Sequence, residues 1–134
     1  MAGDMLLRCM AVGVGGAIGS LARYGLSLWG ASLGTRLPWG TLAANGAGCL
    51  AMGAVMYLVV ERSSLSEGPR LLLAVGLLGG LTTFSTFSYE VLTLLRQGHA
   101  GPALVYLVLS LLAGLAGAWA GWAGTAAILP TAGA

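Results

Sequence analysis

The sequence predicts an all-α membrane protein with four transmembrane helices and a break in the third. Hydrophobic residues fill 57% of the 134 positions and charged residues 7%, whereas soluble proteins are about 25% charged. A chain this short cannot bury so much apolar surface in a water-soluble core. Its few charges also separate four apolar runs, each close to the roughly 20 residues that span a bilayer. We therefore expect a single transmembrane domain over residues 1–134, with lipid as its main solvent.

Each expected helix lies between charged or turn-forming residues. The first runs from about Met5 to Leu28 and carries Arg23 near one end. The second, from Trp39 to Val60, has no charge at all. The third runs from about Arg70 to Leu95, and the fourth from about Pro102 to Ile128.

The arginines, which carry all of the basic charge, divide almost equally between the two sides of the membrane. With four spans, both termini share one side. That side holds Arg8, Arg62 and Arg70, and the other holds Arg36 and Arg96, plus Arg23 if it reaches that surface. The positive-inside rule needs an asymmetry to choose an orientation. The sequence therefore predicts insertion in both orientations, which makes an antiparallel homodimer a natural assembly.

Glycine pairs at four-residue spacing indicate close helix packing. Such pairs put two small residues on one helix face and let backbones approach closely in lipid. They are Gly15 and Gly19, Gly76 and Gly80, and Gly117 and Gly121.

The stretch GLLGGLTTFSTFSYE, residues 76–90, is the most polar part of an apolar span. Gly79 and Gly80 weaken a helix by about 1 kcal/mol each relative to alanine. The neighbouring threonines and serines compete with the helix ladder for backbone hydrogen bonds. Together they favour a break, which lipid tolerates only inside protein or beside water. Carbonyl groups freed by a break suit a cation, and the N-termini of half-helices suit an anion, so the sequence alone does not decide which ion binds. A continuous helix rich in serine and threonine also remains an alternative.

Three further residues could face a polar path. Phe84 and Phe87 share a helix face, and their ring edges carry partial positive charge that could stabilise a small anion. A phenylalanine pair at this spacing is also typical of a core. Asn45 could donate to a permeating ion or make an interhelical hydrogen bond.

No catalytic set is present, and the chain is not expected to be an enzyme. Glu61 and Glu90 are expected at helix ends, and no paired carboxylates appear within a span. A small dual-topology multidrug exporter is one alternative, but it needs a membrane-embedded carboxylate that the first, second and fourth spans lack. A structural membrane subunit without a transport role is another.

Three blocks of the sequence carry a resemblance to a known family. They are GGAIGSLARY at residues 15–24, GTLAANGAG at 40–48 and GLLGGLTTFSTFS at 76–88. The chain resembles the Fluc or CrcB fluoride channels across essentially all four helices.

The resemblance implies a multi-pass protein of the microbial cell membrane that exports fluoride passively as an antiparallel, dual-topology homodimer. It also implies a structural Na⁺ at the dimer interface, held by backbone carbonyls of Gly79 and Thr82. Arg23 would attract anions in a vestibule. The implied fluoride pore residues are Asn45, Phe84, Ser85, Thr86, Phe87, Tyr106 and Ser110.

Overall fold

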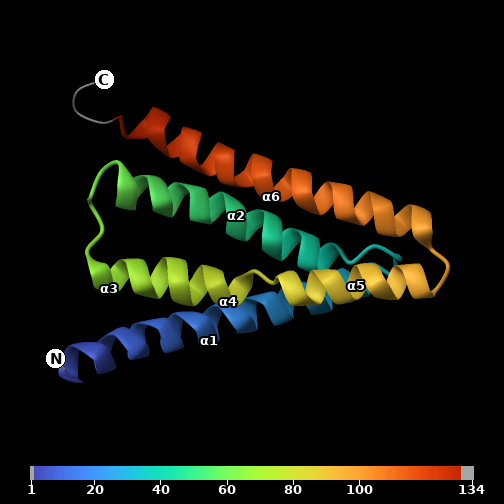
Figure 1. Ribbon diagram of the computed structural model, residues 1–134, viewed down its shortest axis with the longest axis horizontal. Coiled ribbons are helices and arrows are strands. Elements are labelled where there is room, and N and C mark those ends of the chain that lie inside the picture. Colours follow the sequence, from blue (N-terminus) through green and yellow to red (C-terminus); the bar gives the residue numbers. More distant parts are fainter. Residues whose placement is uncertain (1, 131–134) are drawn as a thin grey trace.

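The computed structural model describes residues 2–130, and these form four long helical spans (Figure 1). Helix α1 covers Ala2–Ser32, α2 covers Trp39–Val60 and α6 covers Ala100–Ile128. The third span is divided into α3 (Glu67–Arg70), the π-helical segment η1 (Leu71–Leu78), α4 (Gly79–Leu81) and α5 (Phe84–Arg96). All four spans are long and apolar enough to cross a membrane.

Backbone contacts through glycine hold the bundle together. Helix α2 packs mainly against α6, and α1 packs mainly against η1, with smaller contacts to α2 and α4. A Cβ atom on Gly76 would lie 2.8 Å from the Val12 carbonyl oxygen, and one on Gly80 would lie 2.6 Å from that of Gly16. Either distance is too short for a real side chain, so these positions require glycine. The expected packing role of the glycine pairs is therefore confirmed at the α1–third-span contact.

The third span breaks at Thr82 and Thr83, where the backbone becomes extended. Gly79 and Gly80 themselves remain helical. The sequence thus predicted a break in this segment, but the glycine pair is not its site. The glycines instead serve the close approach of α1, and the break begins two residues after Gly80.

The two described ends of the chain lie at the same end of the bundle (Figure 1). Arg8 contacts Glu67 at 2.9 Å near this end. Arg23 does not reach the opposite surface, because its guanidinium lies beside the break, near the middle of the third span. Three arginines therefore lie on the side of the bundle that holds the termini, and two lie on the opposite side. Arg23 lies between the two sides.

Many large apolar side chains on the four spans are exposed. Leu21 is 70% exposed and Leu115 is 73% exposed, while the buried residues are few and mostly small. Such a surface is stable in lipid or against other protein, where exposed leucine carries no hydrophobic penalty.

Candidate functional site

The two threonines at the break in the third span each bond to the neighbouring backbone. The Thr82 hydroxyl donates at 2.8 Å to the Leu78 carbonyl, which also accepts the Thr82 N–H at 3.0 Å. The Thr83 hydroxyl oxygen accepts the Thr86 N–H at 3.2 Å and caps the start of α5. Helix ends leave backbone groups without intrahelical partners. Thr83 therefore caps the start of α5, whereas the Thr82 hydroxyl adds a second hydrogen bond to a carbonyl that already has a partner.

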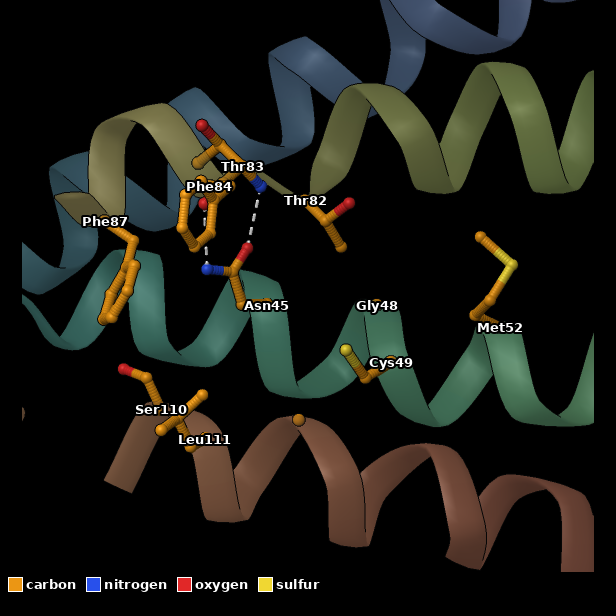
Figure 2. Close-up of a pocket in the computed structure, with 11 residues that line it drawn as sticks. Asn45, Gly48, Cys49, Met52, Thr82, Thr83, Phe84, Phe87, Ser110 and Leu111 are labelled. Atoms are coloured by element: carbon orange, nitrogen blue, oxygen red, sulfur yellow. Dashed lines mark hydrogen bonds between the residues drawn. The ribbon is translucent and has the colours of Figure 1, made fainter. Parts of the chain in front are cut away.

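Asn45 on α2 bridges the break from a neighbouring helix (Figure 2). Its Oδ1 accepts the Thr83 N–H at 2.8 Å, and its Nδ2 donates to the Thr83 carbonyl at 3.1 Å. The amide thus pairs with an extended residue much as a second β-strand would. The interhelical hydrogen bond left open by the sequence is present. An amide group carries two N–H donors, so one N–H of Asn45 is not used by this pair.

A cleft of about 330 Å³ opens beside this pair, between α2, α6 and the break (Figure 2). It brings together four of the pore residues expected from the sequence, namely Asn45, Phe84, Phe87 and Ser110. The Ser110 hydroxyl oxygen is buried and has no hydrogen-bond partner among residues 2–130. Thr82 and Thr83 also line the cleft, together with apolar or small residues such as Met52 and Gly114.

The two phenylalanines lie in different surroundings. Phe84 is 80% exposed at the start of α5, whereas Phe87 is half-buried. Their ring centroids are 5.8 Å apart, and the Phe87 centroid lies 5.4 Å from that of Tyr106. Phe87 thus connects the cleft to Tyr106, while Phe84 presents its ring at the outer face of the bundle.

Glu90 lies in the middle of α5, and the expectation that it would sit at a helix end is wrong. Its Oε1 accepts the hydroxyl of Thr41 at 2.8 Å, and its Oε2 accepts that of Tyr106 at 2.6 Å. These bonds offset the cost of a carboxylate inside a span, because charge-assisted hydrogen bonds are the strong ones. Glu90 follows Phe87 by three positions and so shares its helix face, a spacing that indicates the direction of its side chain but not its partners Thr41 and Tyr106.

A second cleft, of about 200 Å³, reaches Glu90 and Thr41 from the α1–α2 connection. Thr35 and Arg36 line it as well. A row of polar groups therefore extends from the break to the end of the bundle opposite the termini. Beyond Phe87 it consists of Tyr106, Glu90 and Thr41, and then Thr35 and Arg36.

The other residues predicted from the sequence lie around the cleft and do not line it. Arg23 donates its Nε–H to the Gly80 carbonyl at 3.1 Å. Ser85 and Thr86 make hydroxyl contacts with Thr83 at 3.2 and 3.1 Å. Tyr106 binds Glu90, and Gly79 lies exposed just before the break.

Side chains typical of transition-metal sites do not cluster in the described part of the chain. No group of three or more His, Cys, Asp or Glu residues is close enough to hold a metal ion there. Backbone oxygen is the alternative ligand. Within residues 2–130, no hydrogen bond reaches the carbonyl oxygens of Gly79 and Thr82.

The sequence of this chain is similar to those of known membrane channel proteins. Residues 10–122 match the model of a family described as "CrcB-like protein, Camphor Resistance (CrcB)". The matched range contains every candidate site residue named above.

Relatives from three bacteria carry the same description, "Fluoride-specific ion channel FluC". The Thermus thermophilus relative is 51% identical over 100 residues, 74% of this chain and 78% of its own length. The Chloroflexus aurantiacus relative is 49% identical over 98 residues, 72% of this chain and 78% of its own. The Rhizobium leguminosarum relative is 44% identical over 102 residues, 75% of this chain and 82% of its own. The relatives are ion channels and not enzymes.

Proposed function

Because the chain belongs to the CrcB-like family, we propose that it is a fluoride-specific ion channel that lowers cytoplasmic fluoride by passive export. The observation that carries the proposal is the broken third span, whose ends face a cleft with a free amide N–H and a free hydroxyl. The protein is a multi-pass membrane protein, and a break at this depth is costly unless it serves a polar path.

The cleft supplies what a small, strongly hydrated anion requires. Fluoride must exchange water for other donors, and the unused N–H of Asn45 and the hydroxyl of Ser110 are such donors. The edges of Phe84 and Phe87 add weak attraction. Conduction needs several weak sites, because an ion held tightly at one site would not leave. The residues Ser85, Thr86 and Tyr106 would extend these sites, and Arg23 would raise the local anion concentration.

A second copy of the chain is proposed to cover the break. The exposed Phe84 ring, the exposed Ser85 hydroxyl and the exposed Gly79 backbone lie at mid-span. Irregular backbone does not face lipid directly. The nearly balanced arginines support insertion in both orientations, so an antiparallel homodimer fits best.

The proposed Na⁺ would be held by the carbonyl oxygens of Gly79 and Thr82, from both copies. Their lack of hydrogen bonds among residues 2–130 fits a hard cation, which unwound backbone carbonyls coordinate in membrane proteins. The positive charge of the ion would offset the repulsion between the carbonyl oxygens of the two copies, where the break of one chain meets the break of the other. This chain's contribution is to hold those carbonyls in place, through the bond of Thr82 to Leu78 and the bonds of Thr83 to Asn45 and Thr86.

The deciding experiment measures ion efflux from liposomes that contain the purified protein. With sodium present, we expect fluoride efflux without chloride efflux, and a large loss of fluoride flux in Phe84→Ile, which keeps an apolar side chain but removes the ring edge. Arg96→Gln, at the end of α5, is the matched control and should keep wild-type flux. Absence of fluoride-selective efflux from folded protein in sodium would contradict the proposal, and unchanged flux in Phe84→Ile would favour a structural subunit.

The multidrug exporter is less well supported. Its candidate carboxylate, Glu90, already binds two hydroxyl groups. The relatives are described as fluoride channels.

A further inference from the structure

An apolar groove of about 480 Å³ lies at the end of the bundle opposite the termini, where the α1–α2 connection meets the first turns of α6. This meeting point is at the right of Figure 1. Leu37, Trp39, Pro102 and Val105 form its walls. Thr35 and Arg36 border it as its polar residues. No residue of the groove belongs to the cleft at the break.

Arg36 gives this groove an uncompensated positive charge. Its side chain is exposed, and within residues 2–130 it makes no hydrogen bond or ion pair. Glu90 lines the neighbouring cleft with Arg36, but both oxygens of its carboxylate bind hydroxyl groups instead.

The groove lies at the end of two spans, where the sequence predicts the membrane–water interface. Trp39 is the first residue of α2, and tryptophan is enriched at the membrane–water interface. From Val105 the apolar wall continues along the outer face of α6. Val105, Val108 and Leu112 are 48%, 42% and 60% exposed and follow one another at helical spacing.

We propose that this groove binds one anionic phospholipid. The lipid phosphate pairs with Arg36, and an acyl chain lies against Trp39, Pro102 and Val105 before it continues along α6. The charge of Arg36 complements the phosphate, while the apolar walls complement the chain. A free inorganic anion would use only the arginine and leave those walls without a partner.

The test is native mass spectrometry of the full-length protein in detergent, titrated with phosphatidylglycerol or with phosphatidylcholine of the same chain length. The variants are Arg36→Gln, Arg36→Lys and the control Arg96→Gln, which removes an exposed arginine from the same end of the bundle. Size-exclusion elution and fluoride flux are recorded for each variant, so that misfolded samples are recognised.

The wild type and Arg96→Gln should bind phosphatidylglycerol more tightly than phosphatidylcholine. Arg36→Gln should weaken phosphatidylglycerol binding about fivefold, the factor for about 1 kcal/mol per arginine near an anionic membrane surface. Arg36→Lys should restore most of the preference, because it keeps the charge.

Three results would overturn the proposal. One is an equal loss in Arg36→Gln and Arg96→Gln, which would indicate general charge attraction. Another is displacement of the lipid by millimolar inorganic phosphate, which would indicate a simple anion site. The third is a fluoride flux defect in Arg36→Gln with unchanged lipid binding, which would assign Arg36 to the permeating ion.

Discussion

Replacement of Asn45 by alanine is the most direct test of how the break is held. The substitution removes two hydrogen bonds, of 2.8 and 3.1 Å, and leaves the backbone N–H and C=O of Thr83 without those partners. An unsatisfied buried group costs about 1–3 kcal/mol. Interhelical hydrogen bonds in membranes contribute less, about 0.6 kcal/mol on average and about 1.7 at most.

The membrane value is the better guide for each bond, but the upper part of its range applies here. Most interhelical bonds join side chains, which find other partners when the helices separate. Thr83 is backbone in an extended conformation and cannot rejoin a helix ladder without closing the break. Taking about 1 kcal/mol for each bond gives about 2 kcal/mol for Asn45→Ala, roughly a 30-fold change in the ratio of folded to unfolded protein.

The measurement is reversible unfolding in mixed micelles at one protein concentration, with hydrogen exchange across residues 79–86. We expect Asn45→Ala to lose about 2 kcal/mol and to exchange faster at Thr83. Ser110→Ala is the matched control, since Ser110 lines the same cleft and its buried hydroxyl has no partner among residues 2–130. If Asn45→Ala keeps wild-type exchange and loses no more stability than Ser110→Ala, the amide does not hold the break.

Two further predictions concern the glycine packing and the hydrogen bond between Tyr106 and Glu90. Gly19→Ala should cost about 1–3 kcal/mol, because its Cβ would lie 2.8 Å from a backbone nitrogen of the third span; Gly13→Ala, with nothing within 4 Å, should be neutral or slightly stabilising in the same unfolding assay. An equal effect of the two substitutions would contradict the packing argument. Tyr106→Phe should cost about 1.5–3 kcal/mol, the value for a hydrogen bond to a charged group, because it removes the 2.6 Å bond to Glu90. Tyr89→Phe, on the exposed face of α5, serves as its control, and similar stabilities of these two variants would argue against the bond.

The sequence predicted the spans well because lipid imposes a simple requirement. A helix that crosses a bilayer needs a long apolar run, and such runs are visible between charges. The existence of a break was also predictable, since glycine, serine and threonine weaken a helix locally. Its position was not, because Thr83 is held by Asn45 from another helix and Gly80 is held helical against Gly16.

Glu90 shows the limit of the same reasoning. The sequence analysis takes charged residues as the boundaries of the spans. That interpretation is wrong for a charged residue such as Glu90, which has hydrogen-bond partners inside the bundle. The partners of Glu90, Thr41 and Tyr106, come from two other helices. No local pattern around Glu90 reveals them. Site residues whose partners are distant in sequence are therefore the ones that a reading of single spans misses.

The pairing of Asn45 with Thr83 also has a consequence for biogenesis. The two residues are 38 positions apart, and α2 is synthesised before the third span. A half-helix as short as α5, 13 residues, cannot cross a bilayer alone, so the third span must leave the translocon as one apolar segment. The bonds between Thr83 and Asn45 can form only after this segment packs against α2. The local sequence weakens the helix at this point, and assembly with α2 then supplies the two bonds that hold Thr83 in its extended conformation.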